Sequence, residues 1–283
     1  MSKHVHVKKS TGVIEPFSEA KLSRSLRNSG ASEDIIDLIL PKIHSTLYEG
    51  ISTKEIYRKA FMLLHRQLHA LAARYSLKKA IMELGPTGYP FEKYIGELMR
   101  YYGFRVEVGR ILSGKCVSHE VDVIAWNDRN KYMIECKYHN TAGKVSNVQT
   151  PLYIQSRFLD VKSVWETQEE NQGKKFQGWV VTNTRFSEDA KTYGKCVGLH
   201  LVDWDYPLVG SLKELVENAG LFPVTAITNL TKKQKHELIE KGAVLCADLN
   251  ENPELLDTIQ ISPQTKEKII KEVENLCHQV DHV

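Results

Sequence analysis

The chain has 283 residues, 42% of them hydrophobic and 26% charged, which is typical of a soluble globular protein of two or three domains. Its net charge of +3 divides into +6 over residues 1–85, zero over 86–223 and −3 over 224–283. No apolar run approaches the roughly 20 residues of a membrane span, and the first residues lack a signal-peptide pattern. Five cysteines without a CxxC pair argue against a zinc knuckle or a disulfide framework. We therefore expect a cytoplasmic protein with no membrane partner.

Residues 1–85 are predicted to form a mostly helical domain. A hairpin pattern comes first, with HVHVKK and VIEPF on either side of a polar STG turn that contains Gly12. Ser18 suits the N-cap of a helix that Gly30 ends, and apolar residues at helical spacing run through 53–82. The sequence GPTGYP, residues 85–90, is dense in Gly and Pro and is expected to be a linker.

Residues 86–223 alternate between helical and strand patterns, which predicts an α/β domain with a mixed sheet. FEKYIGELMRYYGF reads as an amphipathic helix, followed by the strands RVEVGRIL, HEVDVIAW and KYMIECKYH, with DRN as a tight turn. A helix over 146–160, the strand FQGWVVTN, the short helix SEDAKTYGKCVG and the strand LHLVDW complete the pattern.

Residues 224–283 are predicted to form a small helical domain. Thr231 can cap one helix, and a later helix carries an apolar stripe formed by Ile269, Ile270, Val273 and Leu276. The net charge of −3 argues against phosphate binding by bulk attraction. A helical DNA-binding module and a packing or dimerisation role both remain open.

The strand YMIECKYH carries an acid and a base among apolar residues. Side chains two apart on a strand share a face, so Glu135 and Lys137 point the same way. Asp122 lies 13 residues before Glu135, and antiparallel pairing would bring the two carboxylates together. Such oxygens suit Mg²⁺, while Lys137 would orient a water molecule or stabilise charge developing on phosphorus.

A solvated surface hairpin with a Glu–Lys pair is the alternative interpretation. However, Asp122 and Glu135 are each embedded in an apolar run, VDVIA and YMIEC. An ionised acid buried without a partner costs several kcal/mol, which a metal or a substrate can offset. This embedding favours a functional site.

The stretches FEKYIGELMRYYGF, HEVDVIA, IECKYH and VQTPLY, within residues 87–207, resemble the PD-(D/E)XK nucleases, and among them the Mrr-like type IV restriction endonucleases. The resemblance implies a DNA-cutting site that uses Mg²⁺ or Mn²⁺, with Asp122 and Glu135 as metal ligands. Asp122 follows Val121 rather than the proline of the family pattern. The implied catalytic residues are Glu92, Asp122, Glu135, Lys137, Gln149 and Tyr153.

Three other residues compete for roles at this site. Glu97 is a rival to Glu92 but faces another side of the same helix, and FE at the helix start fits the family better. We expect His119 and His139 to be hydrogen-bonded or surface residues rather than metal ligands.

Residues 3–85 resemble an ATP-cone, the nucleotide-binding regulatory domain of ribonucleotide reductases and their repressor. The matching stretches are VKKSTGVIEPFSEAKL, ISTKEIYRKAF and ARYSLKKAI, with a Lys-Lys pair in place of the family's Lys-Arg. No P-loop pattern occurs, so ATP or dATP is expected as an allosteric ligand rather than a fuel. The alternative is a basic domain that touches the DNA backbone. The implied nucleotide-binding positions are Val7, Lys8, Lys9, Glu15 and Lys21.

Two functions follow. The first is a metal-dependent DNA endonuclease regulated by an adenine nucleotide, assembled as a homodimer or larger because one such site makes one cut. The second is a nucleotide-sensing DNA-binding regulator on a nuclease fold that does not cut. The intact set of Asp122, Glu135 and Lys137 favours the first, and RNA or branched DNA remains an alternative substrate.

Overall fold

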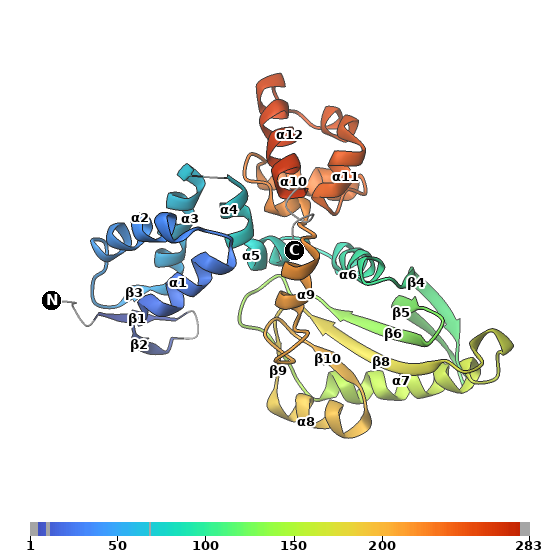
Figure 1. Cartoon of the computed structure of the whole chain (residues 1–283). Helices are drawn as coiled ribbons and strands as arrows, with labels where there is room; N and C mark the ends of the chain where they lie inside the picture. The colour runs from blue at the N-terminus through green and yellow to red at the C-terminus, as the bar shows by residue number, and fades with distance from the viewer. Residues whose placement is uncertain (1–4, 10–11, 68, 278–283) are drawn as a thin grey trace.

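A computed structural model describes residues 5–9, 12–67 and 69–277 of the chain. Three groups of elements are seen in Figure 1: an N-terminal unit, a sheet with helices on both faces, and a C-terminal group of helices. The short helix α5 (Leu77–Met82) lies where the three groups meet. Among the described residues, no helix combines the length and the apolar character that crossing a membrane requires.

The N-terminal unit is a small α/β region. Strand β1 (His6–Lys8) pairs antiparallel with β2 (Ile14–Pro16), as the hairpin pattern predicts, and parallel with β3 (Ile51–Ser52). The third strand comes from a segment more than 40 residues away, so local sequence gives no sign of it. Ser10 and Thr11 of the predicted turn lie outside the described residues, whereas Gly12 adopts a φ of 85°.

Four helices cover this small sheet. Ser18 caps the first of them as predicted, because its hydroxyl accepts a hydrogen bond from the backbone N–H of Lys21 at 3.3 Å. The residues described within 53–82 are helical as the pattern predicts, except at Ser76, where a turn separates α5 from the preceding helix. The helices of the unit are α1 (Glu19–Asn28), α2 (Glu33–His44), α3 (Thr53–Gln67) and α4 (His69–Tyr75).

The central domain contains a five-stranded mixed sheet, as the sequence predicts, in the order β10-β8-β6-β5-β4. Its first three strands in the chain form an antiparallel meander, and the last two add in parallel to its far side. The strands are β4 (Arg105–Ser113), β5 (Ser118–Trp126), β6 (Asn130–Lys137), β8 (Lys175–Thr182) and β10 (His200–Val202).

Helices cover both faces of this sheet (Figure 1). Helix α6 (Tyr89–Tyr101) packs on one face, and α7 (Gln149–Trp165) and α8 (Glu188–Val197) pack on the other. The GPTGYP segment is therefore shorter as a linker than predicted, because Tyr89 and Pro90 already belong to α6. A two-stranded ribbon, β7 (Val145–Ser146) with β9 (Arg185–Phe186), lies beside the main sheet.

The C-terminal segment is helical, as predicted, and Thr231 forms a capping box with Gln234. Three of the four residues of the predicted stripe, Ile269, Val273 and Leu276, are buried. They belong to the same hydrophobic cluster as Phe91 and Tyr94 of α6. The segment's helices are α10 (Lys232–Glu240), α11 (Cys246–Glu251) and α12 (Pro263–Cys277), with 3-10 turns at Val224–Ala226 and Pro253–Thr258. The central domain precedes it with helix α9 (Leu212–Ala219) and also has a 3-10 turn at Glu169–Asn171, between α7 and β8.

Candidate active site

The predicted acidic pair lies where strands β5 and β6 separate. Their register extends from Trp126 and Lys131 as far as Val123 and Ile134. One residue further, the Asp122 carboxylate accepts a hydrogen bond from the backbone N–H of Cys136 at 2.7 Å. The Asp122 side chain thus takes the place of a backbone acceptor on β5. It is held against β6 at Cys136, the residue that follows Glu135.

Glu135 is buried, with 5% of its surface exposed, and both of its oxygens are occupied. Lys137 donates to Oε1 at 2.6 Å and Arg157 donates to Oε2 at 2.8 Å. A buried carboxylate is tolerated when cations and hydrogen bonds replace its lost hydration. The acid and the base of YMIECKYH therefore share a face and contact each other, as strand alternation predicts.

Arg157 is a site residue that the sequence analysis missed. Besides holding Glu135, its guanidinium donates to the carbonyl oxygen of Glu120 and lies 5.3 Å from the centre of the Tyr153 ring. Spacing carries a signal that could have found it. Gln149, Tyr153 and Arg157 recur every four residues and so share one face of α7.

Glu92 lies in the first turn of α6. Burial, reinforced by the charges of Asp122, Glu120 and Glu135, raises the pKa of Glu92 to about 7. Helix α6 therefore brings this acid within electrostatic range of the acids of β5 and β6. Its rival Glu97 is ion-paired with Arg100 on the same helix and contributes to no part of this cluster.

Asp122 is also resistant to ionisation. Burial and the nearby charge of Glu135 raise the pKa of Asp122 to about 6, although the Cys136 N–H, Lys137 and Arg157 act in the opposite direction. Carboxylates that repel one another in a half-buried site match the hard oxygen ligands of a divalent cation, which would relieve the repulsion. The carboxylate oxygens of Asp122 and Glu135 fit Mg²⁺ or Mn²⁺ in chemistry.

The arrangement is nonetheless not a closed metal cage. Among the described residues, no group of three or more His, Cys, Asp and Glu side chains has the geometry to hold a metal ion. One oxygen of Glu135 is paired with Lys137 and the other with Arg157, and at least one of these cationic side chains would have to move away to make room for the metal.

The remaining predicted site residues differ in how closely they join the cluster. Tyr153 is 62% exposed and is linked to it through the Arg157 guanidinium. Gln149 is exposed at the start of α7, where its side-chain oxygen accepts a weak 3.4 Å hydrogen bond from the amide of Asn147. The structure therefore brings Glu92, Tyr153 and the strand residues together, and leaves Gln149 at the rim.

The two histidines that flank the acids have structural partners. His119 contacts Asp160 of α7 at 2.8 Å, and the same carboxylate accepts the backbone N–H groups of Cys116 and Val117. His139 lies 3.2 Å from the Ser146 hydroxyl. As expected from the sequence, both are hydrogen-bonded residues.

The positions proposed for nucleotide binding in the N-terminal unit also come together in part. Lys9 lies 2.8 Å and Lys21 lies 3.2 Å from opposite oxygens of Glu15. These bonds hold the pKa of Glu15 below its ordinary value. Val7 is buried in the centre of the small sheet, and Lys8 is exposed on the same strand. The cluster is thus two lysines bridged by one carboxylate.

Comparisons with known proteins match the middle and the end of the chain to two family models. Residues 85–206 match the restriction endonuclease family model, and residues 222–277 match the model described as AF1548-like, C-terminal. Neither match reaches the N-terminal unit. The prediction of a restriction-endonuclease-like domain is confirmed, whereas the ATP-cone is not shown by these comparisons.

This chain matches nearly the whole length of two relatives. An uncharacterized protein of Archaeoglobus fulgidus is 36% identical over 183 residues, which are 64% of this chain and 99% of the relative. The crystal structure of AF1548, a protein of unknown function, is 34% identical and has a TM-score of 0.54, with 67% of this chain and 98% of that chain covered. The MspJI restriction endonuclease in complex with a 27-mer oligonucleotide is 14% identical, with a TM-score of 0.35 over 71% of this chain and 39% of its own, too weak a likeness to carry an argument.

Proposed function

The chain belongs to the AF1548-like family. We propose that its central domain is a DNA endonuclease that hydrolyses phosphodiester bonds with Mg²⁺ or Mn²⁺. The observation that carries the proposal is the meeting of Glu92, Asp122 and Glu135 beside Lys137, within a domain that matches the restriction endonuclease model. The domain boundaries proposed with it are 1–85, 86–223 and 224–283.

Each residue has a role that its environment supports. Asp122 and Glu135 would hold the cation, and Glu92 would act beside it. The bound cation would polarise a phosphoryl oxygen and lower the pKa of water. Lys137, next to Glu135, would stabilise negative charge that develops on the phosphate. Arg157 would keep Glu135 oriented while Lys137 moves toward the substrate.

Glu92 is the best candidate for moving a proton. In the absence of a cation its pKa is about 7, near neutral pH, where a general base is most effective. From the first turn of α6, Glu92 would accept a proton from the water molecule that attacks the phosphate. Gln149 and Tyr153 would contact the DNA strand at the rim.

Plasmid DNA with Mg²⁺, Mn²⁺ or EDTA tests this proposal. Wild-type protein should cut only with metal, and Asp122→Asn, Glu135→Gln, Lys137→Met and Glu92→Gln should each lose most of the activity. Glu97→Gln is the matched control, because Glu97 lies on the same helix but pairs with Arg100. Cutting by all four variants at the wild-type rate would show that the cluster is not catalytic.

The finer parts of the proposal are nucleotide control and assembly. ATP or dATP would bind at Lys9 and Lys21, releasing them from Glu15, and change cleavage by about 5–150-fold, the usual range of allosteric coupling. Calorimetry on the wild type and on Lys9→Ala with Lys21→Ala tests binding, with Lys42→Ala as control. Light scattering on DNA tests the homodimer that a double-strand cut would need.

A second candidate is a nucleotide-sensing DNA-binding regulator without cleavage activity. The observation that favours it is the full occupancy of Glu135 by Lys137 and Arg157. If that arrangement persists, the positive charges of Lys137 and Arg157 oppose the binding of a cation at Glu135. Metal-independent DNA binding, together with an absence of cleavage at every metal concentration, would support this candidate.

A further inference from the structure

Residues of all three groups of elements line a cleft of about 610 Å³ beside α5. The N-terminal unit contributes Tyr57 and Tyr75, the central domain contributes Lys144 and Arg185, and the C-terminal segment contributes Lys232. A smaller hollow of about 250 Å³ shares Lys232 with it and continues toward α10. None of the residues assigned to catalysis or nucleotide binding lines the cleft.

The cleft is strongly basic. Five cations, Lys78, Lys79, Lys144, Arg185 and Lys232, line it together with only two carboxylates, Glu83 and Asp205. The resulting charge of +3 equals that of the entire chain. Lys79 and Lys232 each lie 3.8 Å from Glu83. Lys144 and Arg185 are exposed, and neither forms an ion pair within the described part of the chain. Such a surface attracts phosphate groups.

One wall of the cleft is aromatic. The rings of Tyr57 and Tyr75 stack with centroids 5.0 Å apart and an angle of 15° between their planes. Both residues come from the N-terminal unit and are half-buried. A basic groove next to an aromatic platform is the usual way in which proteins hold unpaired nucleotides without reading their sequence.

The cleft begins where the acidic cluster ends. Strands β6 and β8 run parallel, with Lys137 opposite Thr182, and the Thr182 hydroxyl donates to the Lys137 carbonyl at 2.7 Å. The Asn183 side chain then donates to the His139 carbonyl oxygen at 2.7 Å and accepts from the His139 backbone N–H at 2.8 Å. The chain continues from these two strand ends directly into the cleft walls at Lys144 and Arg185.

We propose that this cleft holds an unpaired DNA strand that leaves the acidic cluster, so that the substrate is DNA with a single-stranded segment. A volume of about 610 Å³ lies within the range of single-ligand pockets, roughly 300–1,000 Å³, and suits a few unpaired nucleotides rather than a duplex. The phosphates contact Lys144, Arg185 and Lys232, and a base stacks on the tyrosine pair. This substrate assignment rests on the proposed nuclease function.

Fluorescence polarisation in EDTA measures binding separately from cleavage. Labelled single-stranded oligonucleotide, blunt duplex and ATP are the three probes. Lys144→Ala with Arg185→Ala should weaken single-strand binding about tenfold and reduce the slope of log K against log salt by about 1.4, since each lost phosphate contact removes about 0.7. Tyr57→Leu should weaken it about fivefold or more, and Tyr57→Phe should not.

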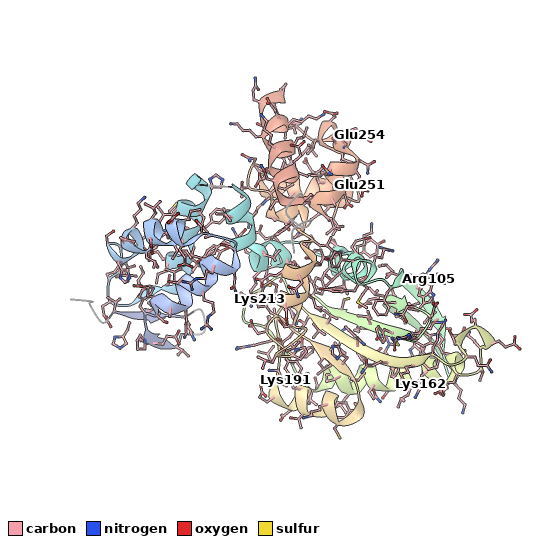
Figure 2. The ribbon with its side chains drawn as sticks, in the orientation of Figure 1. Arg105, Lys162, Lys191, Lys213, Glu251 and Glu254 are labelled. Atoms are coloured by element: carbon pink, nitrogen blue, oxygen red, sulfur yellow. The ribbon has the colours of Figure 1, made fainter. Side chains whose placement is uncertain are left out.

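Arg105→Ala with Lys162→Ala is the matched control, because it removes one arginine and one lysine from the same domain. Figure 2 shows both residues at the end of the sheet away from the N-terminal unit. It should bind all probes as the wild type does. Thermal unfolding verifies that each variant is folded.

The outcomes separate the two proposals. Equal single-strand binding by the cleft and control variants, or equal weakening of the blunt duplex, would overturn the cleft assignment. Loss of ATP binding with unchanged single-strand binding would also overturn it, in favour of a free nucleotide. If the cleft variants bind as expected but wild-type protein cuts neither plasmid nor flapped DNA in Mg²⁺ or Mn²⁺, the cleft assignment stands and the nuclease proposal fails.

Discussion

The ionised side chain of Asp122 lowers the free energy of unfolding, because folding places it in a site where a carboxylate is less stable than in water. In the unfolded chain its proton leaves near the ordinary pKa of 3.8, whereas the folded protein retains it until a pKa of about 6. Between these values the folded state binds more protons than the unfolded state. The free energy of unfolding therefore falls as the pH rises through this interval and stays lower above it.

We expect Asp122→Asn to stabilise the metal-free protein by about 1–2 kcal/mol at pH 7.5 and by much less at pH 4, since a shift of one pKa unit corresponds to about 1.4 kcal/mol. The amide oxygen can still accept the Cys136 N–H. Urea unfolding in EDTA at the two pH values measures the difference. Asp128→Asn, in the exposed β5–β6 turn, is the control, and an equal effect of the two variants would refute the argument.

Arg157 is a positioning residue, since it acts through Glu135. Arg157→Lys retains the charge, but a lysine cannot hydrogen-bond to Glu135 and to the Glu120 carbonyl while it also contacts the Tyr153 ring. We expect about 10–100-fold slower cleavage, the usual cost of losing such a supporting contact, with a higher Mg²⁺ concentration needed for half-maximal rate. Arg157→Met should be worse than Arg157→Lys.

The control for Arg157 is Lys162→Met, on the same helix but paired with Glu166 at 3.4 Å. It should leave both the rate and the Mg²⁺ dependence unchanged. Wild-type kinetics for Arg157→Met at every Mg²⁺ concentration would mean that Glu135 needs no such support.

At the scale of the elements, α7 lies close to β8 because Gly178 has no side chain. A Cβ there would lie 2.6 Å from the Leu199 Cδ2 atom and 3.0 Å from the Phe158 Cγ atom. Phe158 is next to Arg157, so displacement of α7 should disturb the site as well as the core.

Gly178→Ala should therefore destabilise the protein by about 1–3 kcal/mol, as overpacking usually does, and slow cleavage as well. Chemical denaturation and the plasmid assay measure the two effects. Adding Phe158→Leu should restore part of both, because it creates space on the α7 side. A Gly178→Ala protein as stable as the wild type would show that α7 and β8 can move apart at no cost in the free energy of unfolding.

The elements also show how far local sequence can predict this fold. Alternation predicts β5 and β6, and with them the shared face of Glu135 and Lys137. The same reasoning misses β3, because Ile51 pairs with Val7 across a distant part of the chain. It misses Arg157 for a related reason: spacing places the residue on a face of α7, but only packing decides that this face meets Glu135.

The break between α4 and α5 is another feature that periodicity does not predict. The apolar spacing over 53–82 is continuous, and no Gly or Pro interrupts it. The chain turns at Ser76, whose hydroxyl donates to the carbonyl of Ala73 at 3.1 Å. Beyond that turn, Leu77, Ala80 and Ile81 join the core of the central domain instead of the N-terminal core.

The whole molecule thus contains two main hydrophobic cores that meet near residue 72. The first includes buried residues from Val5 to Ala72, and the second extends from Ala73 to Leu276. Hydrogen bonds reinforce the second across distant segments: the Tyr94 hydroxyl donates to the Leu221 carbonyl at 2.7 Å, and the Thr225 hydroxyl donates to the Ala80 carbonyl at 2.6 Å. The central and C-terminal units should therefore unfold together, and the N-terminal unit separately.

We expect two calorimetric transitions that matched core substitutions can distinguish. Ile39 and Leu238 are both buried, in the first and the second core respectively. Truncation of a buried aliphatic side chain costs about 2–5 kcal/mol. In a small unit this lowers Tm by about 4–8 °C per kcal/mol, and in a larger one by about 2–4 °C.

Ile39→Ala should therefore lower only the N-terminal transition, and Leu238→Ala only the other, by a smaller number of degrees. A single transition that both substitutions shift would show that the units are coupled through α5. Under that outcome, a ligand bound in the N-terminal unit would act on the stability of the acidic cluster directly. With two independent transitions, communication between the units requires a ligand that bridges them, and a strand lying across Tyr57, Lys144 and Lys232 would form such a bridge.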